Sequence, residues 1–191
     1  MKKYFLISLI SIMANTAGYL SAGAAVPSFN KVKSQPEYPG FRETYADQND
    51  SGLLNKPAPA FELWGLNGQF YSLKDLRGKI VVLNFWFIAC KPCVNEMPVL
   101  NSIKNKYDPA KVIFLALSLD SKNAVNTFLQ QHQFNYIQLP GVVAVHKKYH
   151  LNAYPVSIVI DARGIVSFVQ TGGPDIGTNL PAAINAALKG V

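Results

Sequence analysis

The sequence has few cysteines, few charged residues and no long run of one charge. Its 191 residues include two cysteines, and 15% of them are charged against 49% that are hydrophobic. Two cysteines are too few for the disulfide framework that stabilises small secreted domains, and the large apolar share excludes a chain that is disordered throughout. Length and composition therefore predict one domain with its own core, extended by additional segments.

Basic residues outnumber acidic ones, but they are dispersed. The chain carries 18 Lys and Arg against 11 Asp and Glu, a formal charge of +7, and these basic residues do not gather in one stretch. Nucleic-acid-binding domains concentrate positive charge on one face or in one run. We therefore expect no nucleic-acid partner.

The N-terminal segment has the pattern of an export signal. Met1-Lys2-Lys3 is followed by the uncharged apolar stretch 4–14 and by the small residues Ala22-Gly23-Ala24, so residues 1–24 are predicted to be a signal peptide. We expect the mature protein to lie outside the cytoplasm, in the periplasm or an equivalent compartment, with peripheral membrane contact or none. The alternative is an uncleaved anchor, because residues 4–26 carry no charge and are long enough to cross a bilayer.

Two further segments follow. Residues 25–56 contain Pro, Asn, Ser and charges of both signs without sustained periodicity, which indicates an extended arm or linker. Patterned sequence begins at Pro57, so residues 57–191 are predicted to form the folded domain. Near its start, Asn67-Gly68 between apolar residues predicts a β-hairpin.

The rest of the domain shows strand and helix patterns in alternation. Apolar runs predict strands at 80–87, 112–119, 156–160 and 165–171, and apolar residues at helical spacing or in helix-forming sequence predict helices at about 93–107, 123–131, 142–149 and 180–189. Alternating strands and helices followed by a hairpin and a last helix predict an α/β fold, with a central mixed sheet flanked by helices.

Both cysteines fall within Cys90-Lys91-Pro92-Cys93, where a buried strand turns into a helix. A disulfide that closes so small a loop stabilises the fold little, so reactivity explains the pair better than stability does. At a helix start, free N–H groups and the helix dipole stabilise a thiolate at Cys90, which we expect to be exposed, while Cys93 lies protected one turn inside. Lys91 adds positive charge, and Pro92 suits a first turn. We predict a redox-active disulfide, no other cofactor and no metal.

Two neighbours of the pair could tune it. Glu96, one turn beyond Cys93, could exchange protons with the thiols or raise their pKa; it could equally be a solvent-facing helix residue, and spacing leaves both interpretations open. Tyr154-Pro155, just before a predicted strand, is a candidate cis peptide bond. Most X-Pro bonds are trans, so the sequence alone does not decide this point.

Several segments together resemble one protein family. They are Val82-Leu83-Asn84-Phe85-Trp86, Cys90-Lys91-Pro92-Cys93, Glu96, Pro98, Tyr154-Pro155, and Ile158-Val159-Ile160-Asp161 with Gly164. In this order and setting, from about Pro57 to Leu188, the chain resembles the thioredoxin superfamily and, within it, the TlpA/ResA-like exported thiol-disulfide oxidoreductases. The resemblance implies a thioredoxin-like fold with an N-terminal extension and a short central insertion at 134–150.

The resemblance also implies roles for individual residues. Cys90 would be the nucleophile and Cys93 the resolving thiol, and Glu96 matches a glutamate typical of the subgroup. Pro155 would be a cis-proline that presents backbone to the substrate, and we place Tyr154, Lys91 and Pro92 beside it in the substrate-binding surface. The implied activity is dithiol-disulfide exchange with protein substrates, as a reductant recharged by a membrane electron donor, with cytochrome c maturation as one pathway.

Two positions depart from the family pattern. Ala89 stands where the family usually has a tryptophan before the first cysteine, which changes the surface that meets a partner. Asn84 stands where thioredoxins proper carry a buried acid, which favours Glu96 as the proton-handling group.

Other functions of a paired-cysteine site fit the sequence less well. A zinc site lacks a second C-x-x-C, covalent haem requires a histidine where Val94 stands, and the peroxiredoxin pattern requires a threonine where Phe87 stands. The remaining alternative is a soft-metal module, in which the two thiolates bind or deliver copper. Met97 is the nearby soft ligand, but its place on the apolar helix stripe favours core packing.

Overall fold

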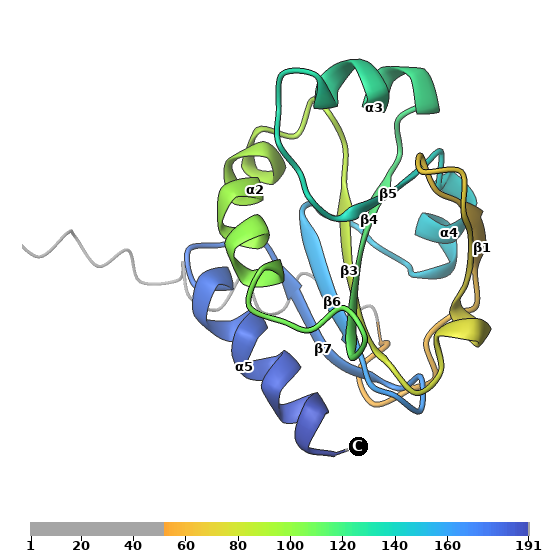
Figure 1. The fold of residues 1–191 in the computed structure, drawn as a ribbon, viewed down its shortest axis with the longest axis vertical. Helices are drawn as coiled ribbons and strands as arrows, with labels where there is room; N and C mark the ends of the chain where they lie inside the picture. The colour runs from red at the N-terminus through yellow and green to blue at the C-terminus, as the bar shows by residue number, and fades with distance from the viewer. Residues whose placement is uncertain (1–51, 191) are drawn as a thin grey trace, which may run out of the picture. The chain divides into compact units, whose positions relative to one another are not determined.

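The computed structural model describes residues 52–190 (Figure 1). The predicted signal peptide and nearly all of the predicted arm lie outside the described residues. Within residues 52–190, no helix is long and apolar enough to span a membrane. The described chain begins along strand β7 (Val166–Thr171), where the N–H of Asn55 donates to the carbonyl of Val166.

A short hairpin precedes the main sheet. Strands β1 (Glu62–Trp64) and β2 (Phe70–Ser72) pair antiparallel around the predicted turn at Asn67-Gly68, and a 3-10 helix, η1 (Leu73–Leu76), follows. Gly68 has a φ of +76°, which suits glycine. The N–H of Gln69 donates to the Asn67 side-chain oxygen and closes the turn. The hairpin prediction is therefore confirmed.

The main sheet has five strands in the order β5-β4-β3-β6-β7. Besides β7 they are β3 (Ile80–Trp86), β4 (Val112–Ser118), β5 (Ile137–Pro140) and β6 (Val156–Ile160). Strand β3 runs parallel to β4 and antiparallel to β6, so the sheet is mixed. All seven residues of β3 are buried because helices or the hairpin cover both faces, which explains the continuous apolar run.

Helices cover the two faces unequally. Helix α2 (Lys91–Lys104) and helix α5 (Ile176–Lys189) lie side by side on one face, and α4 (Val143–Lys148) and the hairpin cover the other (Figure 1). Helix α3 (Lys122–Leu129) follows β4, with buried Val125 in the same core as α2. The predicted α/β fold with a mixed sheet is confirmed. Strand β5 is the element that the sequence patterns missed, and α5 begins four residues earlier than predicted.

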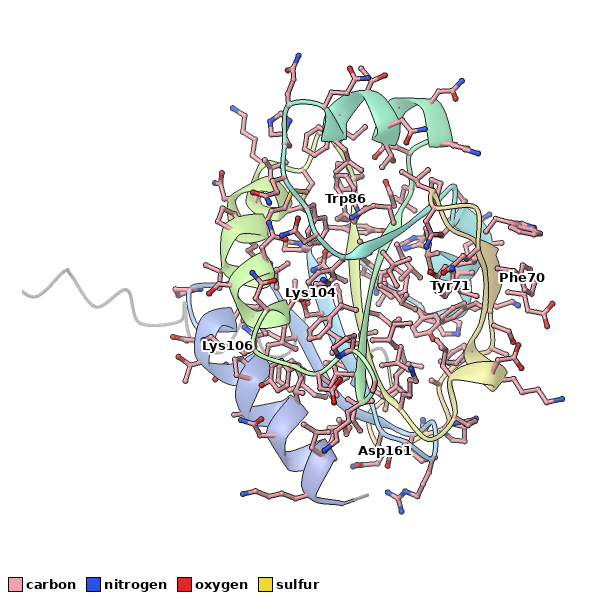
Figure 2. The ribbon with its side chains drawn as sticks, viewed as in Figure 1. Phe70, Tyr71, Trp86, Lys104, Lys106 and Asp161 are labelled. Carbon is pink, nitrogen blue, oxygen red and sulfur yellow. A yellow bond between two sulfur atoms is a disulfide. The ribbon has the colours of Figure 1, made fainter. Side chains whose placement is uncertain are left out.

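Strand register brings distant segments to one end of the sheet. Phe85 near the end of β3 pairs with Val156 at the start of β6, and Val156 pairs with Thr171 at the end of β7. The segment after β3, the segment before β6 and the segment after β7 therefore meet there. Trp86, the last residue of β3, is enclosed at this end, with its ring centroid 5.4 Å from that of Phe128 on α3 (Figure 2).

Candidate active site

The two cysteines form a disulfide at the start of α2. Cys90 is the N-cap residue, and its Sγ accepts a hydrogen bond from the N–H of Cys93 at 3.3 Å. This N–H is one of the free donors of the first helical turn, which stabilise negative charge on sulfur once the disulfide is reduced. Pro92, also in that turn, has no N–H to satisfy.

Cys90 is less exposed than predicted. Cys90 is 6% exposed and Cys93 is 2% exposed, so both are buried in this disulfide-bonded state and Cys90 is the more accessible. The expectation that Cys90 is exposed was wrong because the sequence could not show how the sheet end encloses the helix start. The neighbouring residues Ala89, Lys91 and Pro92 are exposed.

The loop before Cys90 is fixed by a residue that the sequence patterns did not single out. The N–H of Ile88 donates to Asp120 Oδ2 at 2.7 Å, and the Ser118 hydroxyl donates to the same oxygen at 3.1 Å. Asp120 follows β4, the parallel neighbour of β3, so the two strand ends lie together. A polar residue just after a buried strand was the signal that could have identified it.

The peptide bond between Tyr154 and Pro155 is cis, as the resemblance implied. The carbonyl of Pro155 accepts a hydrogen bond from the N–H of Gly172 at 2.9 Å, which joins the start of β6 to the loop after β7. The Tyr154 ring meets the Phe87 ring edge to face, with centroids 5.2 Å apart. Tyr154 therefore lies against the segment that leads into Cys90.

Glu96 faces the loop after β7 and is partly buried. Its carboxylate accepts a hydrogen bond from the N–H of Gly173. A methyl group on Gly172 would lie 3.6 Å from Glu96 Oε1 and 3.3 Å from Pro155 Cδ, so Gly172 lies between Glu96 and Pro155. Burial raises the pKa of Glu96 from 4.5 to about 7, against the opposing effect of the Gly173 hydrogen bond.

Comparison with known protein families shows which family the chain belongs to. Residues 54–169 match the AhpC/TSA family, which covers more than half of the chain. The chain belongs to the AhpC/TSA family. It is a thioredoxin-like member of that family, since its relatives and structural neighbours carry thioredoxin-type names.

Two relatives of this AhpC/TSA member have names that refer to thiol-disulfide or thioredoxin-like proteins, as expected for a chain with a paired-cysteine site. The chain is 36% identical over 131 residues to thiol-disulfide oxidoreductase ResA from Bacillus cereus, covering 68% of this chain and 73% of ResA. It is 29% identical to the thioredoxin-like protein YneN from Bacillus subtilis, covering 68% of this chain and 78% of YneN. The protein is therefore an enzyme of the thiol-disulfide oxidoreductase class.

Solved structures give the same assignment. A Chlorobium tepidum protein proposed to be thiol:disulfide interchange protein DsbE superposes with a TM-score of 0.65 and 29% identity, covering 71% of this chain and 97% of that one. Another Chlorobium tepidum structure, a thiol:disulfide interchange protein of the thioredoxin family, gives a TM-score of 0.59 at 25% identity, covering 69% and 95%.

Asn84 and His132 each have an interaction partner within the protein. Asn84, buried in β3, donates to the Ser157 hydroxyl at 3.2 Å across the β3–β6 pair. His132 stacks on Phe128 with ring centroids 4.0 Å apart. Within the described part of the chain, no group of three or more His, Cys, Asp or Glu side chains could hold a metal ion.

The core beside Glu96 contains a second titratable group that the sequence patterns did not single out. Tyr136 precedes β5 and is buried among aromatic rings, 5.1 Å from Phe114 by ring centroid. Burial and the charge of Glu96 both raise the pKa of Tyr136. The Glu96 carboxyl group is therefore close enough to the apolar core for its charge to act on a buried phenol.

Proposed function

We propose that the protein exchanges disulfides with protein substrates through Cys90 and Cys93. The observation that carries this proposal is the disulfide at the first turn of α2, in which Cys90 is the N-cap residue and is slightly more exposed than Cys93. A stabilising role for a disulfide that joins residues 90 and 93 is small, because the closed loop is so short.

The exchange follows two balanced steps. The Cys90 thiolate of the reduced enzyme attacks one sulfur of a substrate disulfide, forming a Cys90–substrate bond and releasing the other substrate sulfur as a thiolate. The Cys93 thiolate then attacks Cys90 Sγ and releases the second substrate thiolate. The enzyme ends with the Cys90–Cys93 disulfide, and two electrons have passed to the substrate.

Glu96 would serve as the proton-handling group in this cycle. A carboxyl group with a pKa of about 7 is present in both protonation states near neutral pH, so it can accept a proton from a thiol and return it. It lies one turn beyond Cys93 on α2, beside Gly172 and Gly173. Asn84, which cannot titrate, leaves this role to Glu96.

The substrate-binding surface would include Pro155, Tyr154, Lys91 and Pro92. Lys91 and Pro92 are the exposed residues between the two cysteines, and Tyr154 lies against Phe87 in the segment leading to Cys90. In this proposal they would surround the substrate sulfur as it approaches Cys90.

We further propose that the enzyme is exported and works as a reductant outside the cytoplasm, recharged by a membrane electron donor. The predicted signal at residues 1–24 and the similarity to ResA support this proposal. An apocytochrome c, whose haem-binding cysteines must be reduced before attachment, is the substrate that the family resemblance favours.

Substrate trapping tests the roles of the cysteines. In Cys93→Ser, the mixed disulfide with Cys90 has no resolving thiol, so covalent complexes should accumulate on a non-reducing gel and disappear with dithiothreitol. Cys90→Ser is the matched control and should trap nothing. The reverse pattern would contradict the assignment. Tight one-to-one Cu(I) binding by the reduced protein, without reduction of protein disulfides, would favour the copper module instead.

A further inference from the structure

A histidine on helix α4 contacts the tyrosine that precedes Pro155. The Tyr154 hydroxyl lies 2.5 Å from Nδ1 of His146, and the two rings stack with centroids 5.5 Å apart and planes 25° apart. The Tyr154 ring also contacts Phe87, whose plane is nearly perpendicular at 84°. Tyr154 is therefore held by a hydrogen bond and two ring contacts.

The histidine belongs to a firmly packed element. On α4, Val145 is buried and the following residue is His146, while Tyr149 at the end of the helix is completely buried. The Tyr149 ring packs 5.2 Å from that of Phe85 in β3, and its hydroxyl donates to the carbonyl of Pro59. His146 therefore belongs to a well-packed helix, and its hydrogen bond to Tyr154 restrains the position of the tyrosine ring.

The protonation states of both groups allow the tyrosine to donate. Burial and the neighbouring charge of Lys147 lower the pKa of His146, so at neutral pH its imidazole is uncharged, and in the tautomer protonated at Nε2 its Nδ1 accepts the Tyr154 proton. Burial raises the pKa of Tyr154 to about 12, which keeps the phenol protonated and able to donate. Near neutral pH, the imidazole is therefore uncharged and the phenol is protonated, as this hydrogen bond requires.

We propose that His146 is a positioning residue that fixes the Tyr154 ring as one wall of the substrate-binding surface beside the Cys90–Cys93 disulfide. In this way the insertion that contains α4 sets the affinity for protein substrates. Phe87, which is partly buried, packs against that wall, and partly buried Ile88 follows it in the chain, so we expect the favoured substrate to carry an apolar side chain beside its reactive cysteine. The inference rests on the proposed exchange with protein substrates.

A matched pair of variants isolates the hydrogen bond. His146→Asn keeps an acceptor close to the position of Nδ1, and His146→Leu has the same branched shape without an acceptor. With insulin as the protein disulfide, we expect His146→Leu to raise KM about 3- to 10-fold, the range for one hydrogen bond, with kcat unchanged. His146→Asn should stay within about twofold of wild type, and reduction of hydroxyethyl disulfide should be unchanged in both.

A double-mutant cycle with Tyr154→Phe completes the test. If His146 acts through the Tyr154 hydroxyl, then Tyr154→Phe raises KM like His146→Leu, and the double variant adds nothing further. Equal effects of Asn and Leu at position 146, or a parallel loss of insulin and hydroxyethyl disulfide reduction, would show a merely structural role and overturn the inference. A wild-type enzyme that reduces neither disulfide would instead contradict the proposed function itself.

Discussion

Replacing Glu96 by glutamine removes a carboxyl group whose ionisation the fold disfavours. The carboxyl group is partly buried beside Gly172 and Gly173, and its pKa rises from 4.5 to about 7 in the folded protein. Glutamine has nearly the same shape and can still accept a hydrogen bond from the N–H of Gly173. The substitution therefore removes the charge and leaves the packing in place.

The sign and size of the effect follow from proton binding. Because the pKa is raised on folding, the folded state binds more protons than the unfolded state between pH 4.5 and 7. The associated stability is fully present below pH 4.5 and is lost as the pH rises through about 7. The shift corresponds to about 3 kcal/mol, and partial exposure to solvent reduces the expected effect to roughly 2 kcal/mol.

Urea unfolding of the oxidised protein at pH 5, 6, 7 and 8, followed by tryptophan fluorescence, measures this difference. The free energy of unfolding of wild type should fall by roughly 2 kcal/mol relative to Glu96→Gln over this range. Glu62→Gln, which removes a carboxylate from exposed strand β1, controls for the loss of one negative charge. Parallel curves for wild type and Glu96→Gln across all four pH values would refute the reasoning.

Two further predictions concern stability. Leu83 lies in the middle of β3 and is completely buried, so Leu83→Ala should lower the free energy of unfolding by about 2–5 kcal/mol. The control Val143→Ala, at an exposed position of α4, should change it by less than about 0.5 kcal/mol. Equal shifts of the urea midpoint in the two variants would contradict this prediction. Asn101→Leu removes hydrogen bonds to the Gln133 carbonyl at 2.8 Å and from the Asn135 N–H at 2.7 Å, and should cost about 2 kcal/mol. An Asn101→Leu variant as stable as wild type would mean that water replaces both bonds.

The sheet interior and the cysteine pair were predictable because local pattern determines them. The apolar run at Ile80–Trp86 is short and rich in β-branched and aromatic residues, which is typical of a strand covered on both faces, and the C-x-x-C spacing lies where that strand meets a helix. Glycine at position 68 suits the hairpin turn by its conformational freedom alone. These features require no knowledge of distant contacts.

Other features depend on contacts between distant segments and could not be predicted in the same way. Strand β5 has four residues, ends in Pro140 and is defined by its parallel pairing with β4. The hydrogen bond from Gly173 to Glu96 and the contact between His146 and Tyr154 join residues that periodicity does not relate. The low exposure of Cys90 likewise arises from the way three strand ends meet.

In the proposed reaction, Cys90 and Cys93 pass two electrons to a protein disulfide. Reduced enzyme from which small thiols have been removed is mixed with a protein that contains one disulfide. At successive times, the free thiols of both proteins are alkylated and their masses are measured by mass spectrometry. The enzyme should lose two alkylatable thiols for each pair that the substrate gains, and the new enzyme disulfide should join Cys90 and Cys93. Substrate reduction with both enzyme thiols still alkylatable, or no transfer at all, would contradict it.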